Sequence, residues 1–196
     1  MYWEVGEDEN SYSVALQNDL NALDVWCKMW QLNLNEDKCL VMRISCRKER
    51  SVSTYSLDGV LLVPVNSVKY LGILITSDLW WNDHIRQIVG LASHRLCFVW
   101  RLYRNCPETV KETGYTTLVR SHLEYCAPVC CPHLVTQILA VDMVQPRAAR
   151  FIKGNFQWTA NVTEMLRSLH WDTLRSRRET WAWDYLKDLI WHAIPI

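Results

Sequence analysis

The sequence lacks several features that would place it in a specialised class of protein. Its 196 residues contain no run of about 18 apolar residues, which is the length that a membrane-spanning helix needs. It shows no internal repeat or low-complexity tract, and its acidic, polar N-terminus is unlike a signal or transit peptide. We therefore expect no membrane partner and an intracellular protein, cytoplasmic or nuclear, whose cysteines are mostly free thiols.

A net charge is also missing, because 21 basic residues balance 21 acidic ones. A neutral total argues against strong nonspecific binding to nucleic acid. The distribution is nevertheless uneven. Residues 1–37 contain eight acidic residues and one basic residue, Lys28. Residues 86–120 and 143–178, in contrast, each carry a net positive charge. These local basic surfaces are compatible with a nucleic-acid partner, and no pattern indicates a small-molecule substrate.

Familiar catalytic arrangements are absent as well. The sequence has no Asp-Asp dipeptide, and its serine and histidine residues suggest no hydrolase triad. Glu7, Asp8 and Glu9 are acidic, but no apolar strand flanks them to hold metal-binding carboxylates rigid. We interpret them as a solvated tail and predict no catalytic residue, no metal site and no cofactor for this chain.

The N-terminal part predicts one helix and a few short strands. After an acidic, irregular tail over residues 1–15, apolar residues recur at helical spacing between Leu16 and Leu34. Alternation from Cys39 to Ser45 predicts a half-buried strand. Residues 54–57 and 60–63 flank Asp58-Gly59 and predict a hairpin, since this dipeptide suits a type I′ turn. Residues 68–76, VKYLGILIT, predict one further strand.

After Asn82 the spacing becomes helical. One apolar stripe is formed by Ile85, Ile88, Ala92, Leu96, Val99 and Tyr103. Pro107 predicts the start of a helix that runs to about Cys126. A helix over 134–153 should stop at Gly154 and be kinked or split by Pro146. Asn161, with Glu164, and Asp172 are expected to cap two last helices.

This order of elements predicts an α+β fold: one helix, a small antiparallel β-hairpin or sheet, and a mainly α-helical C-terminal half. We expect the change from strands to helices near residues 76–82. The predicted segments are an irregular tail (1–15), a helix with a hairpin and a further strand (16–78), a first helical part (79–130) and a C-terminal helical region (131–196).

Six motifs then carry a resemblance that covers roughly residues 16–180. In chain order they are LQNDLNALDVWCKMWQLNLNEDKCLVMRI, YSLDGVLLVPVNSVKYLGILI, HIRQIVGLASHRLCFVWR, CPETVKETGYTTLVRSHLEY, VQPRAARF and NVTEMLRSLHWDTLRSRRE. Together they resemble the C-terminal part of reverse transcriptases from non-LTR (LINE-type) retrotransposons. The resemblance implies the end of the palm at 16–78, a thumb at 79–130 and the helical region that follows it.

The resemblance also implies roles for individual residues. Family enzymes use Mg²⁺ on an Asp pair located before the LQNDL-like helix, where this sequence has MYWEVGEDENSYSVA instead. Lys38 matches a lysine near the departing pyrophosphate, although a solvent-exposed lysine is the simpler interpretation. Lys69, Tyr70, Leu71 and Gly72 match the primer-grip strand, where glycine permits close approach of a backbone. Alternatively, Gly72 marks a bulge or a packing contact.

Two groups of arginines are candidates for contact with nucleic acid. Arg86, His94, Arg101 and Arg104 resemble the thumb-helix face that follows the template–primer duplex; a solvated face is the alternative. Arg147 and Arg150 lie in VQPRAARF, where the family usually has another arginine in place of Pro146.

A dense set of possible metal ligands lies between the predicted helical segments: His122, Cys126, Cys130, Cys131 and His133. Zinc accepts mixed cysteine and histidine ligands, but this spacing fits no common zinc pattern. A small zinc-binding domain therefore stays an alternative to free core thiols.

Two hypotheses of function follow. The first is a truncated, inactive reverse transcriptase fragment with weak binding to an RNA/DNA template–primer duplex. The second is a retroelement remnant or adopted protein-interaction module with no nucleic-acid role, which the neutral net charge, Pro146 and the many tryptophans favour.

Overall fold

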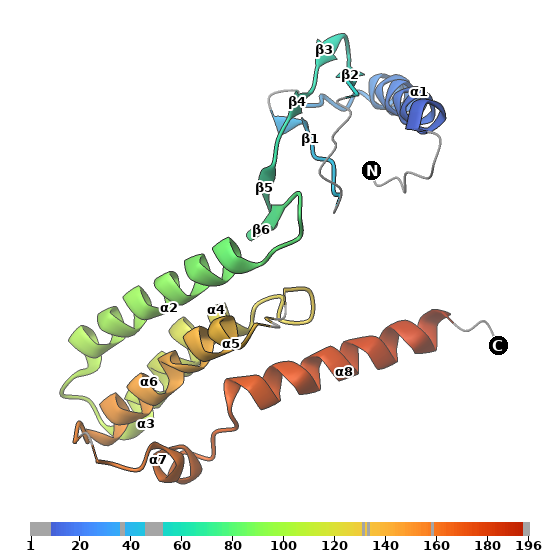
Figure 1. The fold of residues 1–196 in the computed structure, drawn as a ribbon. Coiled ribbons are helices and arrows are strands. Elements are labelled where there is room, and N and C mark those ends of the chain that lie inside the picture. The colour runs from blue at the N-terminus through green and yellow to red at the C-terminus, as the bar shows by residue number, and fades with distance from the viewer. Residues whose placement is uncertain are drawn as a thin grey trace. The chain divides into compact units, whose positions relative to one another are not determined.

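The computed structural model describes residues 9–35, 38–45, 53–130, 132, 134–157 and 159–193 (Figure 1). The chain forms two compact units, residues 1–80 (unit 1) and residues 81–196 (unit 2). In the described residues, unit 1 holds one helix and three pairs of short strands, and unit 2 is helical. The predicted α+β class is therefore confirmed. No helix in the described ranges combines the length and the apolar character needed to cross a membrane.

Unit 1 begins with α1 (Glu9–Met29). The predicted irregular tail over residues 1–15 is thus wrong from Glu9 onward, because Glu9 to Ala15 already belong to the helix; residues 1–8 lie outside the described ones. The helix is fixed to the following strands through Gln17, whose side chain accepts from the Ser56 N–H at 3.0 Å and donates to the Ser56 carbonyl at 2.9 Å.

The first hairpin of unit 1 is confirmed. Strands β2 (Ser56–Leu57) and β3 (Val60–Leu61) pair antiparallel, and the turn residues Asp58 and Gly59 have φ of 51° and 81°. Both angles are positive, as a type I′ turn requires.

The strand predicted from Cys39 to Ser45 is much shorter. Only β1 (Leu40–Val41) is a strand, paired in parallel with β4 (Val63–Pro64). Since Pro64 has no N–H to donate, this ladder cannot extend far.

Residues 68–76 are a second hairpin, and the prediction of one continuous strand is wrong. Strand β5 (Ser67–Tyr70) ends at a turn of Leu71 and Gly72, and β6 (Ile73–Thr76) returns antiparallel, with Tyr70 opposite Ile73. Leu71 has φ of 48° and Gly72 of 88°. Gly72 therefore serves to reverse the chain, because glycine adopts positive φ without steric cost.

Unit 2 contains one long N-terminal helix, α2 (Asn82–Tyr103), and a second helical stretch that changes its winding. That stretch comprises α3 (Glu108–Tyr115), the π-helical segment η2 (Thr116–Arg120) and α4 (Ser121–Glu124). The predicted helix from Pro107 to about Cys126 is confirmed, with Pro107 as N-cap, but its π-helical turn left no sequence signal.

The third predicted helix is split, as Pro146 required. It consists of α5 (Val135–Asp142) and α6 (Val144–Lys153), and Gly154 ends it with φ of 62°. A proline ring clashes with the carbonyl four residues earlier, here Asp142, where α5 ends. Pro146 itself occupies the first turn of α6, where backbone N–H groups have no intrahelical partner. Both halves are therefore intact helices.

Two more helices follow, α7 (Val162–Ser168) and α8 (Leu174–Ala193). The predicted cap of α7 is confirmed, since the Asn161 side chain accepts from the backbone N–H groups of Thr163 and Glu164. Asp172 does not cap α8. That position belongs to Thr173, whose hydroxyl accepts from the N–H of Ser176 at 3.1 Å.

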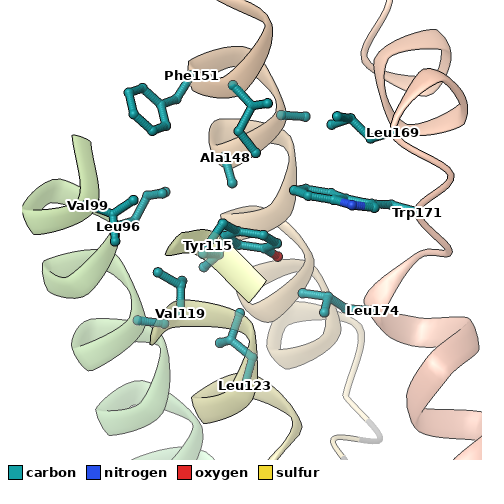
Figure 2. Packing of buried hydrophobic residues seen from close by; sticks show 14 of the residues in the cluster. Leu96, Val99, Tyr115, Val119, Leu123, Ala148, Phe151, Leu169, Trp171 and Leu174 are labelled. Carbon is teal, nitrogen blue, oxygen red and sulfur yellow. The ribbon is translucent and has the colours of Figure 1, made fainter. Parts of the chain in front are cut away.

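All members of the buried apolar cluster lie in unit 2. Figure 2 shows Tyr115, fully buried, with Leu96 and Val99 of α2 on one side and Trp171 on the other. The Tyr115 and Trp171 rings stack with centroids 4.6 Å apart. The predicted stripe of α2 is confirmed, because Ile85, Ala92, Leu96 and Val99 are buried and Ile88 and Tyr103 pack against them.

This cluster spans the two helical segments that the sequence suggested as separate, 79–130 and 131–196. The structure joins them in one unit, since Tyr115 from the first packs on Trp171 from the second. Buried Gln145 reinforces the junction: it donates to the Asp172 carbonyl at 2.8 Å and accepts from the Leu174 N–H at 3.2 Å.

Candidate nucleic-acid interface

Helix α2 presents four of its basic residues to solvent, on the side away from its buried stripe. Arg86, His94, Arg101 and Arg104 are all exposed. Arg86 pairs with Asp83, three residues earlier, at 2.9 Å between Nη1 and Oδ1. Arg101 and Arg104 have no carboxylate partner within the described ranges. The C-terminal end of this row is therefore its least neutralised part, and we call these four residues the α2 basic row.

The α2 basic row ends at a cavity of about 540 Å³. Its lining comes from the end of α2, from α3 and from the end of α6, with residues that follow α2 and α6: Trp100, Arg101, Arg104, Asn105, Lys111, Phe151, Gly154 and Phe156. We call it the α2–α6 pocket. Among the residues that the structure describes, its lining has three cationic side chains and no carboxylate.

Aromatic rings form one wall of the α2–α6 pocket. Trp100 and Phe156 stack with centroids 5.5 Å apart and planes 12° from parallel, and Phe151 lies 6.0 Å from Trp100. Trp100 is 45% exposed and Phe156 56% exposed, whereas Phe151 is buried. The Nζ of Lys111 lies 5.3 Å from the centre of the Phe151 ring, a cation–π arrangement.

Sequence reasoning missed the aromatic wall and Lys111. Trp100 and Phe156 are separated along the chain by α3 to α6, so no local spacing connects them. The available signal was limited to the basic residues themselves and to Gly154, whose stop of α6 turns the chain back toward the end of α2.

Arg147 and Arg150 do not line this pocket. Arg147 is exposed on α6, and Arg150 is partly buried with an Nε that has no hydrogen-bond partner in the part of the chain described. Lys153, one helical turn later, pairs with Glu108 at 2.9 Å.

The residues matched to the primer grip lie in unit 1, at the tip of the β5–β6 hairpin. Lys69, Tyr70, Leu71 and Gly72 are all exposed, Tyr70 to 63% and Leu71 to 71%. Lys69 faces Leu74 across the hairpin, and Leu71 occupies a left-handed conformation that costs a leucine energy. Lys38, also in unit 1, is exposed before β1.

The cysteine–histidine set is only partly described, since Cys131 and His133 lie outside the described residues. Of the other members, Cys130 is buried and its thiol donates to the Cys126 carbonyl at 3.1 Å. Burial and the nearby Arg95 guanidinium lower the pKa of His122. Across the described ranges, no group of three or more histidine, cysteine or acidic side chains could hold a metal ion.

Buried Glu124 and half-buried Asp142 of unit 2 are used in ion pairs. Glu124 receives two hydrogen bonds from Arg177, one of them 3.3 Å long, and Asp142 accepts one from buried Arg178 at 3.0 Å. Burial raises the pKa of Asp142 despite the opposing charge of Arg178. These contacts fix α8 to α4 and α5, so they explain both carboxylates as structural groups.

Comparison with known proteins gives one partial similarity. The chain is 30% identical over 90 residues to a probable RNA-directed DNA polymerase from transposon BS of Drosophila melanogaster. The matched stretch covers 45% of this chain and 9% of that protein. No family model and no solved structure matches the chain. The chain thus contains a region related in sequence to a transposon reverse transcriptase.

Proposed function

We propose that this chain is a segment of a non-LTR retrotransposon reverse transcriptase, inactive as a polymerase by itself, that binds the backbone of a template–primer duplex weakly. The similarity to a transposon polymerase supports the origin. The absence of an Asp-Asp dipeptide from the sequence supports the lack of catalysis, because two-metal nucleotidyl transfer needs paired carboxylates.

The observation that carries the binding proposal is the α2 basic row. Its residues are exposed opposite a buried stripe, so burial of α2 against unit 2 leaves them available to a partner. From Arg86 to Arg104 the helix rises about 27 Å at 1.5 Å per residue, which is long enough to pass several phosphates. Contacts of this type position a duplex without reading its sequence.

Weak affinity follows from the small number of contacts. The net charge is zero and Arg86 already has Asp83 as partner, so two or three phosphates are neutralised at most. Each lost contact lowers the slope of log affinity against log salt by about 0.7 to 0.9.

The test is binding of a fluorescently labelled RNA–DNA duplex across a salt series. The wild-type protein should bind with an affinity that falls as salt rises. Replacing Arg86, Arg101 and Arg104 together by alanine should reduce the slope by about 2. Equal, negligible binding by both proteins would remove the proposal.

One observation favours the second candidate function, an adopted protein-interaction module without a nucleic-acid role. Exposed large apolar side chains gather on the outer part of α8: Trp181, Trp183, Tyr185 and Leu186. Exposed apolar surface of this kind marks interaction sites or a tendency to aggregate. This candidate predicts that the protein self-associates or binds the dye ANS. A monomeric protein that does not raise the fluorescence of ANS counts against it.

A further inference from the structure

The α2–α6 pocket combines cationic and aromatic side chains in one lining. Three cations without carboxylate partners in the described ranges, Arg101, Arg104 and Lys111, surround a wall of aromatic rings. An apolar ligand would leave the cations unused, and a simple inorganic anion would leave the rings unused. The lining therefore matches a ligand that has both an anionic group and a flat ring.

From this lining we infer that the α2–α6 pocket binds one unpaired nucleotide of a nucleic-acid strand. Its base stacks on Phe156, which itself stacks on Trp100, and its phosphate lies among Arg101, Arg104 and Lys111. This inference rests on the proposed function, since it adds a nucleotide site that shares Arg101 and Arg104 with the α2 basic row.

The volume and the chemistry are suitable. The cavity of about 540 Å³ lies within the range of about 300–1,000 Å³ that small-molecule sites occupy. Bases stack on aromatic side chains independently of their identity, because every base has a π-face. Arginine adds planar, bidentate recognition of phosphate, while lysine acts as a point charge.

The rings are available for stacking. Phe156 is stacked on Trp100 on one side, yet 56% of its surface remains exposed, which leaves surface for a second stacking partner. Behind this pair, buried Phe151 holds the wall against the core and carries Lys111 above its ring. The aromatic wall is thus joined to the buried core through Phe151 and exposed at Trp100 and Phe156.

The nucleotide must be unpaired. Inside a duplex both faces of a base are covered by neighbouring base pairs, so no face remains for Phe156. Arg101 and Arg104 belong both to the α2 basic row and to the pocket lining. A strand whose phosphates follow α2 toward its C-terminal end therefore reaches the pocket at the point where pairing has stopped.

The test compares two labelled probes, a blunt RNA–DNA duplex and the same duplex with a three-nucleotide overhang, by fluorescence anisotropy of the full chain. The wild-type protein should bind the overhang probe about ten-fold more tightly, the scale of one base–aromatic stack. Phe156→Leu should abolish that preference and leave blunt-duplex affinity unchanged. The matched control is Phe98→Leu, an aromatic on α2 that is 50% exposed and absent from the pocket lining; it should keep the preference.

A second variant, Lys111→Gln, separates phosphate contact from stacking. For the overhang probe, it should lower the slope of log affinity against log salt by about 0.7 to 0.9, which corresponds to one phosphate contact. The slope for the blunt probe should stay unchanged. Circular dichroism of each variant checks that it folds.

The outcomes separate this inference from the proposed function. Equal wild-type affinity for both probes, with blunt binding retained, overturns the nucleotide pocket alone. Absent blunt binding with retained, Phe156-dependent binding of the overhang overturns the duplex row and keeps the pocket. Loss of the preference in Phe98→Leu as well would show a general aromatic effect and overturn the assignment to this pocket.

Discussion

Units 1 and 2 bury their side chains in different ways. In unit 2, helices from both ends of the unit contribute to one buried cluster around Tyr115. In the described part of unit 1, the buried apolar side chains are Cys27, Leu57 and Ile73, and the strands form three separate pairs. Two-stranded pairs are marginal in water unless more strands or a packed helix support them.

The difference shows which unit should set the stability of the chain. Helices satisfy their backbone hydrogen bonds internally, so unit 2 needs only one apolar face per helix to build a core. Strands satisfy their backbone hydrogen bonds through neighbouring strands. In the two-stranded pairs of unit 1, each strand has a neighbour on one side and an edge on the other. We therefore expect unit 2 to unfold cooperatively and unit 1 to open at lower free energy.

The largest expected effect comes from the core of unit 2. Leu174→Ala removes a fully buried side chain and should lower the free energy of unfolding by about 3 kcal/mol. The same change at Leu186, which is 47% exposed, should alter it by less than about 0.5 kcal/mol. Urea unfolding followed by far-UV circular dichroism measures both.

The matched substitution in unit 1, Leu57→Ala, should leave this main transition in place, although Leu57 is buried. If Leu57→Ala shifts the main transition as much as Leu174→Ala does, the two units share one cooperative core and the comparison fails.

A smaller pair of effects comes from glycine. Gly72→Ala places a side chain at φ of 88° and should weaken the β5–β6 hairpin by about 1 kcal/mol. Gly90→Ala, inside α2 where an added methyl group meets nothing within 4 Å, should stabilise unit 2 by about 0.5–1 kcal/mol. Amide hydrogen exchange of β5–β6 and of α2 reports the two changes separately. If both substitutions changed stability in the same direction, backbone conformation would not be what determines the two effects.

The smallest effect is a pH dependence of unit 2. Because burial raises the pKa of Asp142 in the folded protein above its ordinary value of 3.8, the folded state holds that proton more tightly. The stability that this group contributes is thus greatest below pH 3.8. It falls as the pH rises through the pKa that Asp142 has in the folded protein.

Asp142→Asn removes this dependence. The wild-type protein should lose stability relative to the variant between pH 4 and pH 7, measured as the difference in urea midpoint. A gain of the wild type over this interval would mean that the ion pair with Arg178 outweighs burial.

Much of the fold was predictable because its signals are local. The stripe of α2, the Asp58-Gly59 turn, the Asn161 cap and the split at Pro146 each depend on residues close in sequence. The Leu71-Gly72 turn was missed because leucine seldom adopts positive φ, so VKYLGILIT has the pattern of a continuous strand. The extra helical turns over Glu9 to Ala15 lack an apolar stripe, since they follow an acidic stretch.

The site was predictable only in part. The α2 basic row follows from helical spacing, and the structure places all four residues in solvent. The pocket needs Trp100, Lys111 and Phe156 together, and the packing of α2, α3 and α6 brings them there. This arrangement depends on tertiary packing, which cannot be predicted from composition or from the spacing of residues along one helix.

The central claim is that the basic residues of α2 bind a duplex because of their positions on the helix. The total charge of the chain does not account for this binding. The most direct measurement compares two triple variants on the blunt RNA–DNA duplex at low salt. One replaces Arg86, Arg101 and Arg104 by alanine, and the other replaces the exposed Arg167, Arg175 and Lys187, which carry the same total charge. We predict that the first loses at least ten-fold in affinity while the second stays within about two-fold of wild type. Equal losses in both variants would contradict the account.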